Sequence, residues 1–557
     1  MRSVMKTCVG FLLFLFVLSP LSGKTLMDED FADSDDISNW ERTTGEWRIE
    51  DGSLVGKDCE ADGFIATGIR GGDVSWTNYS VSMDVKMESR GSDWRDGPWI
   101  GIRYQNSRQA YTVGFYDRGT YLLKANDGRH TSGQNALAST PETIQDNQWH
   151  EVEISAVGNI LSVSLDGECI VAARDGDWLD VPPISRGNIV LSARQHTGSP
   201  GSTEVRFRNV VVRSRSEVPE GARTLLEEQR EMEKFVGEQE SRNWHGVQKR
   251  VMAFYYPWYG TPEVSGHWRH WDGINREEKK IATSTHYPAI GPYDSQDPEI
   301  MARHIHQAKE HGIDTFIFSW WGKGDFSDRA LPRMLEEAQE QDFKLSLYWE
   351  RAPKRNGSRV EGSVQTLSYV LEKYGDHPAF LRVDGKPVIF IYGRVMGQIA
   401  WRQWKPIIEK TRAETGQDFL LIADGYGNEN YARVFDGIHV YNPVGWVIDK
   451  SRNALRDEAE ERYGNAVDLA HRFNKIAACT IIPGYNDTKI REPGKATGRK
   501  DGDIYRILWR NAIQAGADWV VITSWNEWHE GSDIEPSVEY GDLYLDLTAQ
   551  FADQFKN

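Results

Sequence analysis

The sequence predicts a chain of two domains, an all-β sandwich followed by a (β/α)8 TIM barrel. Its 557 residues are too many for one ordinary domain. Short runs with period-two alternation predict strands up to about residue 214, whereas from Val251 onward apolar strands alternate with amphipathic helical segments. We therefore expect a sandwich over 25–214, a helical linker over 215–247 and a barrel over 248–557.

Residues 1–23 have the features of a secretory signal. Arg2 and Lys6 give a positive start, and Val9–Leu18 form an apolar run that is too short to span a bilayer. Ser22-Gly23 offers small residues for cleavage. The segment predicts a secreted or periplasmic protein, and the absence of a longer apolar run predicts no membrane span.

The composition limits the classes of partner. A net charge of −18 argues against nucleic acid and against an anionic membrane surface. The chain is rich in aromatic residues, with 21 Trp and 22 Tyr, and flat aromatic faces are what sugar rings pack against. Two large aromatic-rich cores would explain the same numbers, so this observation leaves both interpretations open.

Eight alternating runs, separated by Gly, Asp and Asn, predict the strands of the sandwich. They are 47–50, 79–85, 99–104, 111–116, 149–154, 161–165, 189–193 and 205–212. Their order resembles the concanavalin-like, laminin-G-type jelly rolls, through Gly45-Glu46-Trp47, Asn147–Ile154, Leu165-Asp166-Gly167 and the closing strand from Phe207. The resemblance implies a jelly roll whose concave face binds glycans in many such modules. A packing domain that supports its neighbour is the alternative.

The expected linker is charged and prone to helix formation. Leu225, Leu226, Met232 and Phe235 form one narrow apolar stripe along it. A stripe of this width predicts a helix that rests against a neighbouring domain.

Three cysteines follow the signal, Cys59, Cys169 and Cys479. An oxidising compartment allows a bridge between Cys59 and Cys169, and three buried free thiols are equally consistent with the sequence. The spacing of the cysteines does not indicate a metal site.

Eight strand-helix units predict the barrel. We expect its strands to begin at Val251, Thr315, Leu345, Pro387, Phe419, Gly437, Cys479 and Trp519. Helical patterns lie between most of them, at 298–311, 327–341, 363–374, 401–415, 465–475 and 503–516. An open doubly wound sheet is the alternative, but no glycine-rich phosphate loop follows the first strand.

The carboxyl ends of the strands, where barrels of this kind place their chemistry, combine aromatic and polar residues. The segments are 254–260, 318–322, 347–350, 391–393, 424–426, 439–442, 483–486 and 525–530. Any one of these aromatics would serve as a cap on the core. Together they predict an aromatic-lined cleft with hydrogen-bonding groups, as a carbohydrate requires.

The loop after the last predicted strand carries two carboxylates, Glu527 and Glu530, among tryptophans. Glycoside cleavage commonly uses two carboxylates, and burial raises the pKa of one so that it stays protonated as the acid. The alternative is that one of them only clasps the loop. Glu350 is a third candidate acid, and an ion pair with Arg351 or Arg394 is the alternative role for it.

The barrel resembles glycoside hydrolase family 99, the endo-α-1,2-mannosidase and endo-mannanase family. The motifs that carry the resemblance span about 250–540. They are Phe254–Gly260, Gly266-His267-Trp268 with His270-Trp271, Tyr293–Pro298, His304, Gly312-Ile313-Asp314, Ser319–Gly322, Trp525–Gly531 and Ile534-Glu535-Pro536.

The resemblance implies a retaining hydrolase that cuts inside α-mannoside chains, at α-1,2 or related linkages in mannan or high-mannose glycans. The sugar's own 2-hydroxyl would attack the anomeric carbon and give a 1,2-anhydro sugar. Glu527 would be the base for that attack, and Glu530 would be the acid and later the base for water. The implied sugar-lining residues are Tyr256, Trp320, Trp321, Glu350, Tyr392 and Asn526. No metal or cofactor is implied, the partner is a polysaccharide or glycan substrate, and we expect a monomer.

Three departures from the family pattern bear on the substrate. The third strand reads Tyr348–Ala352 in place of a His-Ile-Glu-Pro-Tyr-like end, Trp525 stands for Phe, and Ser532-Asp533 stands for Thr-Gln. They leave the acid pair intact, so an endo-glycosidase for a different α-glycan is one alternative. A carbohydrate-binding protein with an inactive barrel is a second, and a sugar-transfer enzyme without a nucleotide-sugar loop is a third.

Overall fold

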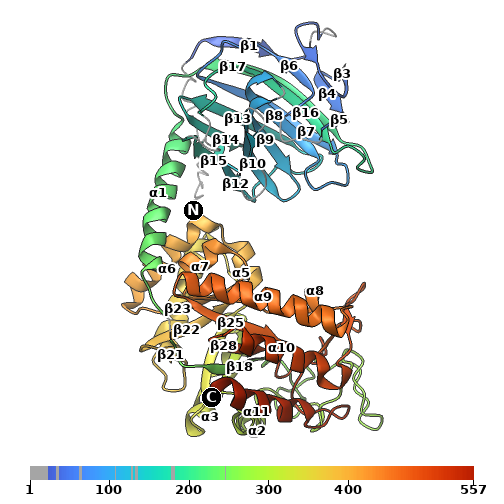
Figure 1. Ribbon diagram of the computed structural model, residues 1–557, viewed down its shortest axis with the longest axis vertical. Coiled ribbons are helices and arrows are strands. Elements are labelled where there is room, and N and C mark those ends of the chain that lie inside the picture. The colour runs from blue at the N-terminus through green and yellow to red at the C-terminus, as the bar shows by residue number, and fades with distance from the viewer. Residues whose placement is uncertain are drawn as a thin grey trace, which may run out of the picture. The chain divides into compact units, whose positions relative to one another are not determined.

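The structure is a computed structural model that describes residues 23–557 except 33–36, 62–65, 107, 127–128, 132–135, 177–181 and 245. The predicted signal, 1–23, therefore lies outside the described residues apart from Gly23. The chain divides into two compact units at Arg230/Glu231 (Figure 1). Among the described residues no helix has the length and apolar character needed to cross a membrane.

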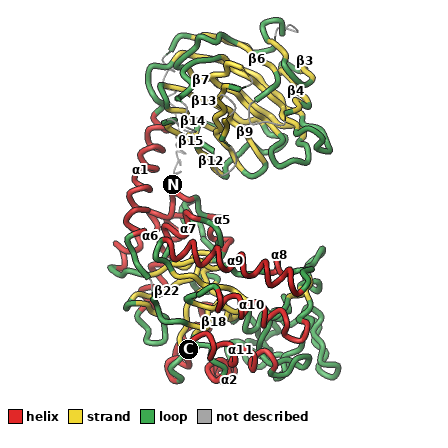
Figure 2. The backbone as a smooth tube through the Cα atoms, viewed as in Figure 1, coloured by secondary structure: helices red, strands yellow, loops and turns green. Residues whose placement is uncertain are grey.

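The first unit is the predicted β-sandwich, which consists almost entirely of strands and loops (Figure 2). One sheet contains β1 (Thr25–Glu29), β3 (Glu46–Glu50), β4 (Ser53–Lys57), β7 (Tyr79–Ser89), β13 (Trp149–Val157), β14 (Ile160–Leu165), β15 (Glu168–Arg174) and β17 (Glu204–Ser214). The other contains β2 (Glu41–Arg42), β5 (Cys59–Glu60), β6 (Ile69–Gly71), β8 (Gly97–Asn106), β9 (Gln109–Tyr116), β10 (Gly119–Asn126), β11 (Arg129–His130), β12 (Ala138–Thr140) and β16 (Asn188–Gln195).

Period-two alternation produces the sandwich core. In β7 the side chains of Val81, Met83, Val85 and Met87 are buried, while the residues between them are only partly buried. These side chains join one apolar cluster with residues of both sheets, as expected when two sheets pack face to face. Each of the predicted runs lies within a strand of this unit.

The structure decides whether Cys59 and Cys169 form the bridge that the sequence allows. Cys59 is a free thiol buried on β5, so the bridge to Cys169 on β15 is not formed. Cys479 is also a buried free thiol, on a strand of the second unit.

Helix α1 (Glu220–Glu240) occupies most of the expected linker. Its first half belongs to the first unit, where Ala222 and Leu225 pack on Ala172 of β15. Its second half belongs to the second unit, where Met232 and Phe235 join the large apolar cluster. The division between the two units therefore falls inside this helix.

The second unit is a closed barrel of parallel strands, which confirms the predicted fold and excludes the open sheet. Its strands are β18 (Arg250–Tyr255), β19 (Thr315–Trp320), β20 (Lys344–Trp349), β22 (Lys386–Ile391), β23 (Leu420–Asp424), β24 (Gly437–His439), β25 (Ile476–Ile481) and β28 (Trp519–Ile522). The ring closes because β28 pairs with both β25 and β18, and β20 pairs with β22. Short pairs outside the ring involve β21 (Arg382–Val383), β26 (Tyr485–Asn486) and β27 (Ala496–Thr497).

Helices alternate with the barrel strands along the chain. They are α2 (Pro298–Glu310), α3 (Phe326–Glu340), α4 (Arg359–Val370), α5 (Gly393–Gln398), α6 (Trp404–Thr415), α7 (Glu429–Val434), α8 (Val444–Val447), α9 (Arg452–Arg472), α10 (Asp503–Gln514) and α11 (Leu543–Lys556). Local capping sets several starts. At α2, for example, the Asp297 side chain accepts a hydrogen bond from the Glu299 amide and Pro298 occupies the first turn.

Two predicted boundaries around α9 were wrong. The helix begins at Arg452, well before 465, and β25 begins at Ile476, before Cys479. The buried positions Leu455, Ala459 and Tyr463 lie four residues apart among charged side chains, so their stripe is narrow and contains few strongly apolar residues.

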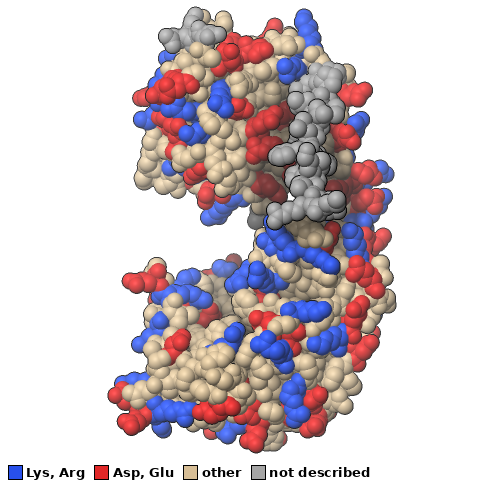
Figure 3. Space-filling view, turned by 180° about the vertical axis from the view of Figure 1, so that it is seen from behind, with Lys and Arg blue, Asp and Glu red and all other residues tan. Residues whose placement is uncertain are grey.

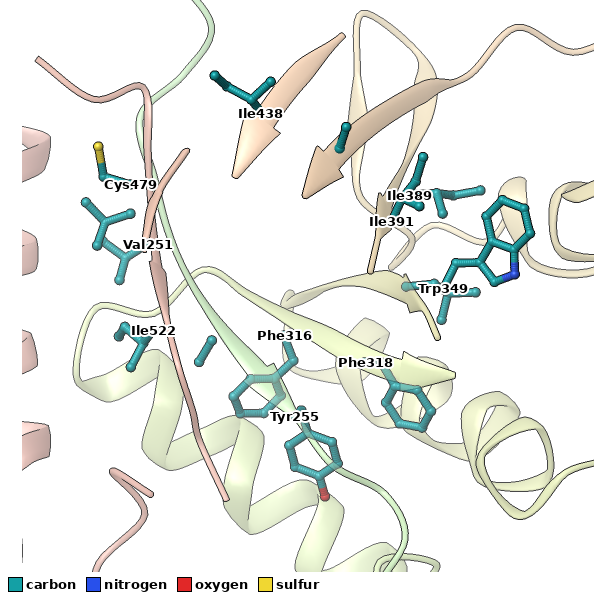
Figure 4. Close-up of a cluster of buried hydrophobic side chains, with 14 of the residues drawn as sticks. Val251, Tyr255, Phe316, Phe318, Trp349, Ile389, Ile391, Ile438, Cys479 and Ile522 are labelled. Atoms are coloured by element: carbon teal, nitrogen blue, oxygen red, sulfur yellow. The ribbon is translucent and has the colours of Figure 1, made fainter. Parts of the chain in front are cut away.

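Both faces of the barrel strands are buried, and this explains their continuous apolar character. On β18, Val251, Ala253 and Tyr255 belong to an apolar cluster that also includes side chains of the helices. Figure 4 shows part of this cluster. Met252 and Phe254 belong to a second cluster, made of residues that alternate with the first along the strands. Polar side chains are consequently displaced to the ends of the strands and the loops that follow.

Candidate active site

The loop after β28 is buried along its whole length, from Thr523 to Ser537. Buried backbone groups must find hydrogen-bond partners, and here the loop supplies many of its own. The Ser524 amide donates to the Ser532 carbonyl at 2.8 Å, and the Ile534 amide donates to the Ser524 carbonyl at 3.0 Å. The chain therefore doubles back and brings Glu527 and Glu530 into one cavity.

Gly531 makes the turn at the end of this segment. Its φ of +56° lies in the left-handed region, which side chains disfavour. A Cβ atom at this position would lie 2.8 Å from Thr285 Oγ1 and 3.3 Å from the Asn486 amide nitrogen. That amide donates to the Glu530 carbonyl at 2.6 Å, so the close approach at Gly531 also fixes the backbone of Glu530.

Asn526 fastens the loop to the first strand of the barrel. Its Oδ1 accepts from the Tyr256 amide at 2.8 Å, and its Nδ2 donates to the Tyr256 carbonyl and to Tyr293 Oη, each at 3.0 Å. The side chain is fully buried and does not line the cavity. The structure therefore places Asn526 behind the site, where it positions Tyr256, and not among the groups that line it as the sequence predicted.

Two further buried carboxylates hold the loop from the other side. Asp533 lies 3.0 Å from Arg499 and 2.8 Å from His286. Burial acts to raise the pKa of Asp533, but the charge of Arg499 and the hydrogen bond with His286 hold it below its usual value. Glu535 accepts a hydrogen bond of 2.8 Å from Tyr293 Oη. Such contacts between buried polar groups rigidify the segment that carries Glu527 and Glu530.

The cavity that receives the two acids has a volume of about 200 Å³. It is lined by Tyr256, Trp258, Trp321, Tyr348, Glu350, Tyr392, Arg394, Tyr441, Arg491, Glu527 and Glu530. Of the residues predicted for the site, Asn526 and Trp320 are outside this lining. Trp320 lines a separate cavity, and its Nε1 donates to Asp328 at 3.0 Å.

Glu527 has a histidine as its partner. His529 Nδ1 lies 3.5 Å from Glu527 Oε1, and the His529 amide donates to the same oxygen at 3.2 Å. His529 Nε2 donates to the His270 carbonyl at 2.8 Å. Burial alone would lower the pKa of His529, but the hydrogen bond and charge of Glu527 outweigh it and raise that pKa. A protonated His529 supplies a positive charge beside the Glu527 carboxylate.

Glu530 has a different environment. Tyr441 Oη donates to its Oε2 at 3.1 Å, and Arg491 donates to its Oε1 at 3.0 Å. Tyr256 Oη in turn donates to Tyr441 Oη at 2.6 Å. Burial and the charge of Glu527 raise the pKa of Glu530 to about 7, against the lowering effect of Arg491. A carboxyl group with this pKa can both give and take a proton near neutral pH.

Glu350 is the third acid of the cavity. It is buried and accepts a hydrogen bond of 2.8 Å from Ser319 Oγ. Among the ion pairs of the described part of the chain none includes Glu350, so neither Arg351 nor Arg394 pairs with it. Burial raises its pKa to about 8, although the positive charge of Arg394 acts to lower it. At neutral pH the group is therefore largely protonated and can donate a hydrogen bond.

Several lining residues were not predicted as site residues. The aromatic members Trp258, Tyr348 and Tyr441 lie in the segments that the sequence assigned to strand ends, so position alone could have indicated them. Arg394, whose guanidinium lies 5.3 Å from the Trp321 ring, follows the fourth such end. Arg491 comes from a long loop after β25 and carries no signal in the sequence.

The described residues contain no group of three or more His, Cys, Asp or Glu side chains arranged to hold a metal ion. What the cavity offers is a set of carboxyl groups, phenols and guanidinium groups between aromatic rings. This set can move protons and hold hydroxyl groups.

The barrel is similar to known glycosyl hydrolases. Residues 246–555 match the model of glycosyl hydrolase family 99, and residues 27–213 match that of the 3-keto-alpha-glucoside-1,2-lyase-like domain. The glycoprotein endo-alpha-1,2-mannosidase of Mus musculus is 26% identical, over 54% of this chain and 74% of its own length. The glycoprotein endo-alpha-1,2-mannosidase-like protein of Homo sapiens is 28% identical, over 56% and 76%. Among solved structures, the GH99 endo-alpha-mannosidase from Bacteroides thetaiotaomicron in complex with bis-tris-propane is 30% identical over 55% of this chain and 97% of its own, with a TM-score of 0.47.

The close contacts at Gly531 predict that alanine destabilises the protein more there than at Gly516. Gly516 also has a positive φ, of +79°, but no atom lies within 4 Å of its Cβ position. We expect Gly516→Ala to lower the free energy of unfolding of the barrel by about 1 kcal/mol through backbone strain alone. Gly531→Ala should lower it by about 2–3 kcal/mol, because contacts with Thr285 and Asn486 are added. Chemical denaturation of both variants measures this, and equal losses would contradict the role given to the close contacts.

Proposed function

Because the chain belongs to glycosyl hydrolase family 99, we propose that it is a retaining, endo-acting glycosidase of α-mannosides. Relatives named glycoprotein endo-alpha-1,2-mannosidase support α-1,2 or related linkages, in mannan or high-mannose glycans. The observation that carries the proposal is the pair Glu527 and Glu530, which share one cavity but have different partners. Two titratable groups in different environments can divide the roles of acid and base.

In the first step the sugar's 2-hydroxyl oxygen bonds to the anomeric carbon while the bond to the leaving oxygen breaks. Glu527, which lies beside His529 and raises the pKa of that histidine, takes the proton of the 2-hydroxyl. Glu530 gives its proton to the leaving oxygen, which suits a carboxyl group whose pKa is about 7. The product of this step is a 1,2-anhydro sugar and a released chain.

In the second step water opens the 1,2-anhydro ring. Glu530, now ionised, takes a proton from water as the oxygen of water bonds to the anomeric carbon. Glu527 returns its proton to the 2-hydroxyl oxygen. Two inversions at one carbon give net retention, and Arg491 and Tyr441 stabilise Glu530 in its charged form between the steps.

The remaining residues of the cavity bind and orient the sugar. Trp321 and Tyr392 present aromatic faces, and the largely protonated Glu350 can donate a hydrogen bond to a hydroxyl group. Tyr256 is held at the base of the site by Asn526. We assign the binding of sugar to Tyr256, Trp321, Glu350 and Tyr392, and a positioning role to Asn526.

We further propose that the chain is exported, secreted or periplasmic, and monomeric. Arg2, Lys6 and the apolar run 9–18 support export. When the protein is produced by an exporting host, we expect the N-terminus of the mature chain to lie close to Gly23. Sequencing that terminus tests export, and a mature protein that retains residues 1–23 would contradict it.

Digestion of α-mannans and high-mannose glycans, with sizing of the products, tests the activity itself. We expect internal fragments as products, because the proposed enzyme cuts within chains. Release of monosaccharide alone would exclude endo action. A protein that binds these glycans without cutting them would be a carbohydrate-binding protein with an inactive barrel, and cleavage of another α-glycan would redefine the substrate.

The roles of the two acids predict different responses to the leaving group. Glu527→Gln and Glu530→Gln should each lower kcat for a mannan chain by about 10²- to 10⁴-fold while binding persists. An activated aryl leaving group needs no protonation, so it should restore much of the activity of Glu530→Gln but not of Glu527→Gln. The exposed Glu310→Gln on α2 is the matched control. Equal recovery in both variants would contradict the assignment.

The partner of Glu530 predicts a shift in pH dependence. Since Glu530 must be protonated in the first step, kcat/KM should fall as the pH rises through about 7. Arg491 lowers the pKa of Glu530, so Arg491→Met should move this alkaline limb to higher pH by about one unit. Arg491→Lys keeps the charge and should leave the limb near its original position. A limb that stays in place in Arg491→Met would show that Glu530 is not the group titrating.

A further inference from the structure

A second cavity, of about 840 Å³, opens beside the proposed active site. Its lining comes from the end of β19, the segments that follow β19 and β20, helix α4 with the turn after it, and Glu414 of α6. Trp321 lines both cavities, so a chain bound at Glu527 and Glu530 can continue past this ring into the larger space. The family resemblance implies sugar contacts at Trp320 and Trp321, but it assigns no role to the charged residues of this space.

The larger cavity has an aromatic wall that is held in place. The rings of Trp320 and Tyr369 are stacked, with centroids 6.3 Å apart and planes inclined by 25°. The buried Asp328 accepts hydrogen bonds from Trp320 Nε1 at 3.0 Å and from Tyr369 Oη at 2.8 Å. Fixed aromatic faces beside polar groups are suited to the apolar face of a sugar ring.

The rim of this cavity is positively charged. Lys323, Arg351, Lys354 and Arg355 line it, against the two carboxylates Glu372 and Glu414. None of the four cations takes part in an ion pair within the described part of the chain. Lys323 Nζ lies 4.8 Å from the centroid of the Tyr369 ring, so this charge is next to the aromatic wall.

The loop that carries three of these cations has a fixed backbone. The Arg351 carbonyl accepts from Trp349 Nε1 at 2.6 Å. Helix α4 packs so closely on the loop that a Cβ atom on Gly362 would lie 2.0 Å from the Pro353 carbonyl oxygen. The loop begins at the third strand end, where Arg351-Ala352 replaces the Pro-Tyr of the expected pattern. A preorganised loop loses little entropy when it binds a ligand.

Exposed cations usually form a solvated face, and over the side shown in Figure 3 basic and acidic side chains are interspersed. Here the cations surround a concave aromatic wall, on a chain whose net charge is −18. The hydroxyl groups of a neutral glycan can accept hydrogen bonds from these cations but cannot compensate their charge. Unpaired guanidinium and ammonium groups bind phosphate, sulfate and carboxylate groups through charge-assisted hydrogen bonds.

We propose that this cavity binds an anionic substituent, a phosphate, sulfate or carboxylate, carried by the α-glycan that the neighbouring acids cleave. This inference rests on the proposed function for the identity of the chain, and it extends that function from neutral to acidic α-glycans. Tyr369, backed by the buried ring of Trp320, packs against the sugar that bears the substituent, while Lys354 and Arg355 contact the charged group.

The experiment measures binding apart from cleavage, with the full chain carrying Glu527→Gln. Calorimetric titration compares a neutral α-mannan oligosaccharide with the same oligosaccharide carrying one phosphate monoester, one sulfate or one uronic acid. At least one charged ligand should bind about tenfold more tightly than the neutral one. Adding Lys354→Ala with Arg355→Ala should abolish this preference. Arg456→Ala with Arg510→Ala removes two charges from the exposed faces of α9 and α10 and should retain it.

Equal affinity for neutral and charged oligosaccharides, or a preference that survives the loss of Lys354 and Arg355, would overturn the proposal. Inorganic phosphate and sulfate are titrated alone as a further arm. If either free ion binds as tightly as the glycan that carries it, the cavity is a site for free anions and the proposal fails. Because these titrations need no turnover, a failure of the proposed hydrolysis is detected separately, by the absence of products from the parent enzyme.

Discussion

The architecture of the site depends on the burial of the loop after β28. Since Thr523–Ser537 is withdrawn from water, many of its backbone groups form hydrogen bonds within the loop, with the first barrel strand or with the segments packed on it. Pairing leaves few arrangements open to the loop, and the one adopted sends Glu527 and Glu530 into the same cavity. The free-energy cost of leaving buried polar groups unpaired thus restricts the geometry of the candidate active site.

Closure of the barrel makes this pairing possible. Asn526 reaches the backbone of Tyr256 because β28 and β18 are hydrogen-bonded neighbours, which an open sheet would not provide. The two acids are then distinguished by what surrounds them, His529 for one and Tyr441 with Arg491 for the other. The positions of Glu527 and Glu530 are set by the hydrogen bonds of the loop backbone, whereas their proton affinities are set by neighbouring side chains. The two properties therefore have separate origins in the fold.

Much of the fold and of the candidate site could be predicted from hydrophobic periodicity and from the positions of strand ends, because both can be read from short stretches of sequence. The sandwich strands, the barrel and the assembly of Glu350, Glu527 and Glu530 follow from them. Asn526 lies outside the lining of the cavity because its side-chain amide bonds to the backbone of Tyr256, which its position in a motif does not reveal. Arg491 was missed because its approach to Glu530 depends on the path of a long loop, which no periodicity describes.

The net charge is a property of the whole chain, whereas the charge inside a cavity depends on the few groups that line it. A net charge of −18 describes the field at a distance and bears on solubility and on partners such as nucleic acid. A ligand inside a cavity responds to groups within about 8–10 Å, the screening length at physiological salt. The smaller cavity concentrates carboxyl groups and the larger one cations, with Trp321 in the wall of both. An acidic chain can therefore present a positive surface to its ligand where the fold gathers a few cations.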